Sequence, residues 1–169
     1  MPDIEFAFIA DSAETTPGQK FSVLGGGVSQ IGGSGFPLRH PHLALVICLQ
    51  IATTEFGREH EVRIGLQGPD GGDVAGAVGR IGANGSGDGR DAYVTFSVDL
   101  WNIVFPGTGD YSFRITVNGA ERKRLPLVIT LAAPSVSEPR SEPRPAAAVS
   151  ESAEPSRRRR TTTQRRYDA

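Results

Sequence analysis

Cysteine, long apolar runs and helical periodicity are all scarce in this chain of 169 residues. Its one cysteine, Cys48, has no partner for an internal disulfide, which fits a reducing compartment. The longest apolar run, residues 43–51, is too short to span a bilayer. The first residues also lack the basic and apolar regions of a secretory signal. We therefore expect a cytoplasmic protein without a membrane span.

Alternation of apolar and polar residues with a period of two dominates the chain, and Gly, Pro, Asn and Asp separate the alternating runs. The run at residues 42–51 is apolar on both faces, as a central strand is. These signals predict an all-β fold, a two-sheet antiparallel β-sandwich of about eight strands, with a small closed barrel as the alternative. The expected strands are residues 4–8, 19–25, 42–51, 59–68, 72–82, 91–100, 110–117 and 122–131.

The last two expected strands are joined by Asn118-Gly119, which favours a type I′ turn because both central positions of that turn need positive φ. The step from Pro106 to Tyr111 resembles the tyrosine corner of immunoglobulin-like sandwiches, in which the hydroxyl bonds to nearby backbone. A partly exposed rim position is the alternative for this tyrosine. Phe113 stands where an immunoglobulin domain has its second cysteine, so the predicted fold is immunoglobulin-like in shape only.

The final expected strand carries Arg122, Lys123 and Arg124 ahead of Pro126. Cations and proline protect an exposed sheet edge because they discourage pairing with another strand. We therefore expect an edge strand with both arginines on its outward face. A ligand-binding role for the three cations is the alternative.

Residues 132–169 differ from the preceding part in composition and charge. Residues 1–131, the expected β-sandwich domain, hold 10 Lys and Arg and 14 Asp and Glu, which gives a net charge of −4. Residues 132–169 hold 8 Arg and 5 acidic residues, which gives a net charge of +3. The total net charge of −1 therefore combines an acidic domain with a basic tail. This Pro-, Ser-, Ala- and Arg-rich tail has almost no large apolar residue and is predicted to be disordered. An arginine cluster in it is a candidate patch for nucleic acid or another anionic surface, with a solvated tail as the alternative. The cluster consists of Arg157, Arg158, Arg159, Arg160, Arg165 and Arg166.

Catalytic and cofactor motifs are not found in the sequence. His40, His42 and His60 could bind a metal only if neighbouring strands brought them together, and no Cys or acidic cluster has metal-ligand spacing. The glycine-rich run of residues 24–36 has neither the Lys nor the following helix of a phosphate loop, and we expect a flexible surface loop. Cys48 lies in the most apolar run and is expected to be buried and inert. The sequence therefore predicts no enzyme, no cofactor and no metal site.

Three stretches in a fixed order carry a family resemblance. They are FAFIADSAETTPGQKFSVLGGG, FPLRHPHLALVICLQI and PGTGDYSFRITVNG. Together they resemble an uncharacterised, mainly actinobacterial family of small β-sandwich proteins, known as a domain of unknown function. The resemblance covers residues 2–131 and implies the sandwich fold, but no activity, substrate or site residue comes with it.

These observations favour a non-catalytic interaction module that binds another protein through its loops or an edge strand, with the basic tail for anionic partners. A sandwich that binds a small molecule or carbohydrate with its glycine-rich loop cluster is the alternative. An enzyme with a histidine metal site is a third and weaker hypothesis, because no motif supplies the ligands.

Overall fold

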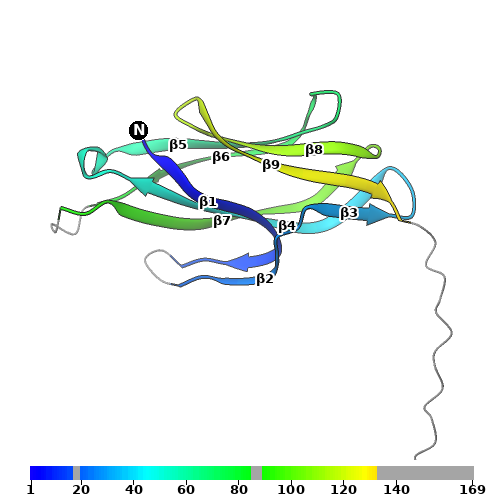
Figure 1. Ribbon diagram of the computed structural model, residues 1–169, viewed down its shortest axis with the longest axis horizontal. Helices are drawn as coiled ribbons and strands as arrows, with labels where there is room; N and C mark the ends of the chain where they lie inside the picture. Colours follow the sequence, from blue (N-terminus) through cyan, green and yellow to red (C-terminus); the bar gives the residue numbers. More distant parts are fainter. Residues whose placement is uncertain (17–19, 85–88, 133–169) are drawn as a thin grey trace, which may run out of the picture. The chain divides into compact units, whose positions relative to one another are not determined.

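The computed structural model describes residues 1–16, 20–84 and 89–132 (Figure 1). They contain nine β-strands and one short 3-10 helix, so the predicted all-β fold is confirmed with one strand more than expected. The elements are β1 (Asp3–Glu14), β2 (Ser22–Gly26), β3 (Gln30–Gly33), β4 (Leu38–Ile51), η1 (Thr53–Glu55), β5 (Glu59–Gln67), β6 (Asp73–Gly82), β7 (Ala92–Phe105), β8 (Gly109–Val117) and β9 (Ala120–Leu131).

The strands form two sheets packed face to face. The first sheet has the order β2-β1-β4-β7, and the second has the order β3-β9-β8-β5-β6. In Figure 1 the strands β5, β6, β8 and β9 lie above β1, β4 and β7. The predicted antiparallel sandwich is confirmed, with one exception: β3 and β9 are parallel, with Gln30 opposite Val128. The immunoglobulin-like shape stays a prediction.

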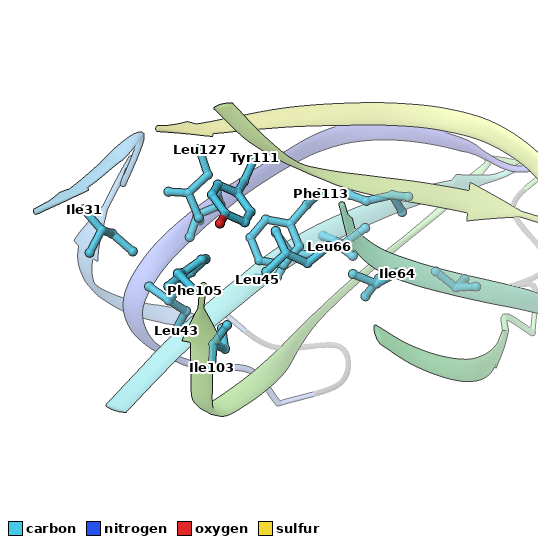
Figure 2. Packing of buried hydrophobic residues seen from close by; sticks show 14 of the residues in the cluster. Ile31, Leu43, Leu45, Ile64, Leu66, Ile103, Phe105, Tyr111, Phe113 and Leu127 are labelled. Carbon is cyan, nitrogen blue, oxygen red and sulfur yellow. The ribbon is translucent and has the colours of Figure 1, made fainter. Parts of the chain in front are cut away.

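Alternate side chains of both sheets point inward and form one apolar core (Figure 2). Strand β4 is at its centre, because β1 pairs with one side of it and β7 with the other. Leu45 and Ile47 of β4 face the core, and Val46 on the opposite face is also fully buried. The prediction of a central strand buried on both faces is therefore confirmed. The largest buried side chains are Leu43, Leu45, Ile47, Leu49, Ile51, Leu66, Phe105, Tyr111, Phe113, Ile115, Leu127 and Ile129.

The middle of the outward face of the first sheet is covered by its own N-terminal hairpin. Strand β1 pairs with β4 only as far as Ala10 and then pairs with β2. Thr15, just beyond β1, reaches β7, where its hydroxyl accepts a hydrogen bond of 3.0 Å from the N–H of Ser97. Figure 1 shows this hairpin as a separate layer beneath the first sheet. The hairpin thus explains why Cys48, on the face away from the core, is only 3% exposed, as predicted for a buried thiol.

The glycine-rich run is not the flexible loop that the sequence predicted. It contributes the end of β2 and the whole of β3, and Ile31 of β3 belongs to the core. Gly25 has a positive φ of 61°, and a side chain there would overlap the carboxylate of Asp11. The amides of Gly27 and Val28 both donate to the carbonyl of Ile9. The run therefore forms the bend that carries the chain from the first sheet to the second.

Strands β4 and β7 are longer than predicted where they pair with each other. The expected turn before residue 42 is strand, because β4 begins at Leu38, and β7 continues past Leu100 to Phe105. Asn102 has a positive φ of 52°, which is uncommon outside glycine and interrupts the alternation of β7. Trp101 therefore points to solvent while Ile103 points into the core.

The C-terminal hairpin has the predicted turn. Asn118 and Gly119 have φ values of 50° and 83°, both positive, as a type I′ turn requires. The hydroxyl of Tyr111 donates a hydrogen bond of 2.9 Å to the carbonyl of Gly107, and its ring is buried. The predicted tyrosine corner contact is confirmed, and the exposed rim alternative is wrong.

Strand β9 is only partly an edge strand. Strand β3 pairs with Val128–Leu131 and leaves the preceding residues, including Pro126, without a strand neighbour on that side among the residues that the structure describes. Arg124 lies on the outward face, as predicted. Arg122 does not, because the register against β8 skips it, and its buried Nε has no hydrogen-bond partner within the described part of the chain. The reason is a β-bulge in β9, where Arg122 is an extra residue that interrupts the alternation of the two faces.

The predicted tail begins where β9 ends. Its arginine cluster, residues 157–160 and 165–166, lies outside the described residues, so its disorder and its anion binding stay predictions. In the described part of the chain, no helix has the length and apolarity that crossing a bilayer requires.

Candidate interaction surfaces

The outward face of β7 carries two exposed aromatic residues, eight positions apart. Tyr93 is 58% exposed and Trp101 is 66% exposed. Both belong to a row of outward-facing residues paired with the outward residues of β4, and the side chains between them are short and polar. The row consists of Tyr93, Thr95, Ser97, Asp99 and Trp101.

Trp101 is held in place by two neighbours. His42 lies directly opposite on β4, and the two rings stack with their centroids 4.0 Å apart and their planes inclined by 27°. The Nε2–H of His42 donates to the Asp99 carboxylate over 2.8 Å. The carboxylate thus orients the imidazole, and the imidazole supports one side of the indole. We call Trp101, His42 and Asp99 the Trp101 platform.

A groove of about 640 Å³ lies at the end of the sandwich beyond this strand. Val104, three residues after Trp101, is exposed and lines the groove. The turn between β5 and β6 forms one side, and the loop between β7 and β8 forms the other, with Tyr111 below it. Its lining residues are Gly68, Pro69, Asp70, Gly72, Asp73, Val74, Val104, Pro106, Gly107, Thr108 and Tyr111.

A second groove, of about 730 Å³, crosses the outward face of the second sheet. Gly65 of β5 and Gly76 of β6 lie directly opposite each other and leave its floor without side chains. Arg63 and Arg114 are among its lining residues. We call this surface the glycine-floored groove.

The arginines near this groove are ion-paired with glutamates. Arg114 and Arg124 both contact Glu121, with Nε to carboxylate distances of 2.8 and 3.0 Å. Hydrogen bonds from Arg124, and then from Arg114, lower the pKa of Glu121 below its ordinary value. Arg63 lies 3.2 Å from Glu61 of its own strand. The side chains of all these pairs are at least one-third exposed, so each pair contributes little stability and can be exchanged for another anion.

The histidines are not brought together. His42 lies in the first sheet beside Asp99, whereas His60 lies in the second sheet, where the side-chain amide of Asn118 donates to its Nδ1 over 3.0 Å. The Nε2 of His60 is buried and has no hydrogen-bond partner among the described residues. Over residues 1–16, 20–84 and 89–132, no group of three or more His, Cys, Asp or Glu side chains could hold a metal ion. The proximity of His42 and His60, which a zinc site would need, is therefore not found.

Sequence reasoning missed the residues that make these surfaces. The glycine-rich run, which the sequence favoured for binding, lines neither groove. No binding role was predicted for Trp101, Gly65 or Arg114. The alternation of β7 held a usable signal, because it places Trp101 on the polar face together with Asp99.

Comparisons with known proteins give a family but no activity. The model of a family of unknown function, DUF6941, matches residues 5–130. No curated protein matches the chain. A solved structure, the Pseudomonas fluorescens alkylpurine DNA glycosylase AlkC bound to DNA containing an abasic site analog, is similar over 76% of this chain and 30% of its own, with 12% identity and a TM-score of 0.42. This likeness supports no conclusion about function. The family resemblance is thus confirmed, and the actinobacterial distribution stays a prediction.

Proposed function

We propose that this chain, which belongs to the DUF6941 family of unknown function, is a non-catalytic domain that binds another protein through the Trp101 platform. The observation that carries the proposal is an indole that is two-thirds exposed and yet fixed in orientation. Tryptophan is the residue type most enriched among those that dominate protein interfaces. An exposed tryptophan in a fixed orientation is therefore a strong candidate for an interface anchor.

The neighbours of Trp101 reduce the cost of binding. A side chain that must be ordered on association loses conformational entropy, and a preorganised one loses less. Stacking on His42 already orders the indole. The free side of the ring suits an apolar or aromatic side chain of the partner, and the half-exposed carboxylate of Asp99 suits a hydrogen-bond donor or a cation beside it.

Tyr93 provides a matched control on the same strand and the same face. Its exposed fraction is close to that of Trp101, but no ring contact to Tyr93 occurs among the described residues. Trp101→Ala and Tyr93→Ala therefore remove similar exposed apolar surface, and only the first removes the platform.

Quantitative capture from an extract of the native host tests the proposal. Immobilised wild-type domain and Tyr93→Ala should retain the same partner, and Trp101→Ala should retain it at least about tenfold less, as expected for an interface hot spot. Because the chain has one tryptophan, the partner purified in this way should shift the emission of Trp101 to shorter wavelength on titration. Equal capture by Trp101→Ala and wild type, or binding without an emission shift, would contradict the proposal.

A carbohydrate ligand is the second candidate, because a free indole face beside a carboxylate also suits a sugar ring. The same emission measurement separates the two functions. A shift produced by oligosaccharides, combined with no captured protein that depends on Trp101, would favour the carbohydrate.

A further inference from the structure

Gly65 is a glycine that the domain itself does not require. It lies inside β5, a strand paired on both sides, by β8 and by β6. Its φ is not positive, and an added Cβ would meet no atom within 4 Å. Glycine inside a strand is unfavourable, because it loses more backbone entropy than other residues and offers no side chain to pack. Glycine at such a position often marks a site where a ligand or another backbone approaches closely.

The row that contains Gly65 runs across four strands. It starts at Gly76 on β6, passes Gly65 on β5 and Arg114 on β8, and reaches Arg124 on β9. Neighbouring strands are about 4.8 Å apart, so the two glycines expose about 10 Å of bare backbone that leads to a guanidinium group.

Side chains on both sides of this row form the walls of the groove. Val78, Arg63 and Thr116 form one wall, because Arg63 is paired with both of the others. Gln67 contributes to the opposite wall. The groove is open along its length, unlike the enclosed pockets that bury most of a small ligand, and its bare floor suits the main chain of an extended peptide.

The charged lining residues of the groove are Glu61, Arg63, Asp73 and Arg114, and the two arginines are the groups among them that suit a carboxylate. Arg63 and Arg114 are diagonal neighbours on adjacent strands, because Arg114 is paired with Gly65. Guanidinium groups bind carboxylates in a bidentate manner, and the present partners of these arginines, Glu61 and Glu121, are held in exposed pairs that exchange readily.

We infer that the glycine-floored groove binds an extended polypeptide segment of a partner protein, with its main chain over Gly65 and Gly76 and a carboxylate between Arg63 and Arg114. This surface is on the second sheet and does not depend on the Trp101 platform of the first. It therefore gives the domain two separate binding surfaces.

Anisotropy measurements on the full chain test the inference. The probe is a fluorescein-labelled pool of hexapeptides with Glu at the fifth position and a free C-terminus. A second pool has an amidated C-terminus, and a third has Gln in place of Glu. Wild type should bind the first pool, and the pool that loses binding identifies whether the C-terminal or the side-chain carboxylate is recognised.

Gly65→Val and Gly79→Val form a matched pair. An added Cβ has open space at both positions, but Gly79 does not line the groove. Gly65→Val should weaken peptide binding at least tenfold with an unchanged or higher melting temperature, and Gly79→Val should bind as wild type does. Arg63→Gln and Arg114→Gln should each weaken binding about tenfold without a change in Trp101 emission.

Several outcomes would overturn the inference. They are the absence of binding of all three pools to wild type at millimolar concentration, wild-type affinity in Gly65→Val, and equal affinity for all three pools. Binding of a single-stranded oligonucleotide with the same dependence on Gly65, without peptide binding, would assign the groove to nucleic acid instead.

Discussion

Thr15 and Ser97 connect the N-terminal hairpin to the far edge of the first sheet. The N–H of Ser97 donates to the Thr15 hydroxyl over 3.0 Å, and the two hydroxyl oxygens lie 3.1 Å apart. Strand β7 has no strand neighbour on this side among the described residues. The threonine therefore satisfies a backbone donor that would otherwise be left at an open edge, and it holds the hairpin down over β4.

Thr15→Val keeps the shape of the side chain and removes both hydrogen bonds. We expect a loss of about 1 kcal/mol in the free energy of unfolding, the usual net value of a hydrogen bond. The hairpin should also lift more often and expose Cys48, so that the thiol reacts several times faster with a disulfide reagent. Thr16→Val, at an exposed position, is the control and should leave the reaction rate unchanged. Equal rates in wild type and Thr15→Val would show that the hairpin does not control access to Cys48.

Tyr111→Phe keeps the buried ring and removes the hydroxyl that bonds to Gly107. The expected loss in the free energy of unfolding is about 1 kcal/mol, measured by urea denaturation. Tyr93→Phe removes an exposed hydroxyl on β7 and should change the stability by less than about 0.5 kcal/mol. If Tyr111→Phe were as stable as wild type, the corner would hold the loop by packing alone.

Gly107 lies in the loop before β8 and Gly109 is the first residue of β8, and the two positions differ in the side chains that they tolerate. Gly109 has a φ of 143°, and a side chain there would overlap the ring of Pro69. Gly107 has no positive φ and open space at its Cβ position. Gly109→Ala should destabilise the domain by about 1–3 kcal/mol, and Gly107→Ala should be close to neutral. Thermal unfolding of the two variants measures the difference, and similar melting temperatures would contradict the described loop geometry.

In an NMR titration, the carboxyl group of Glu121 should show a pKa below the ordinary value of a glutamate. Arg124→Ala should raise this pKa most, Arg114→Ala should raise it less, and Arg63→Ala should leave it unchanged, because Arg63 is paired with Glu61. A lowered folded pKa stabilises the domain above the ordinary glutamate pKa, and this contribution is lost as the pH falls through the folded value. The contribution is small because the carboxylate is exposed. A larger effect of Arg114→Ala would reverse the assigned order of the two arginines.

Most strands could be predicted from the sequence because alternation is a local property. Strand β3 could not, since its four residues include two glycines and become a strand only through pairing with the distant end of β9. The extension of β7 was missed for another reason. Asn102 shifts the alternation between Trp101 and Ile103 through its positive φ, which the local pattern of apolar residues does not reveal.

The candidate surfaces were harder to predict than the fold because they join residues that are far apart in the sequence. His42 suggested a metal ligand, and only the register of β4 against β7 places it beneath Trp101. Gly65 lies in a run of regular alternation, and this pattern predicts an ordinary strand whether or not Gly65 has a side chain. Its significance depends on Gly76 and Arg114, which reach the same row from two other strands.

The parallel pairing of β3 with β9 also affects how the domain is made. Strand β3 is synthesised early, but its partner strand is the last of the domain, so β3 remains unpaired in the growing chain while most of the other strands emerge. An unpaired apolar strand is a hazard during translation, because it can pair with other nascent chains. With Ile31 as its only large apolar residue and two glycines among its four residues, β3 is poorly suited to such pairing. Strand β3, which stays unpaired until β9 has been synthesised, thus has a sequence with little tendency to aggregate.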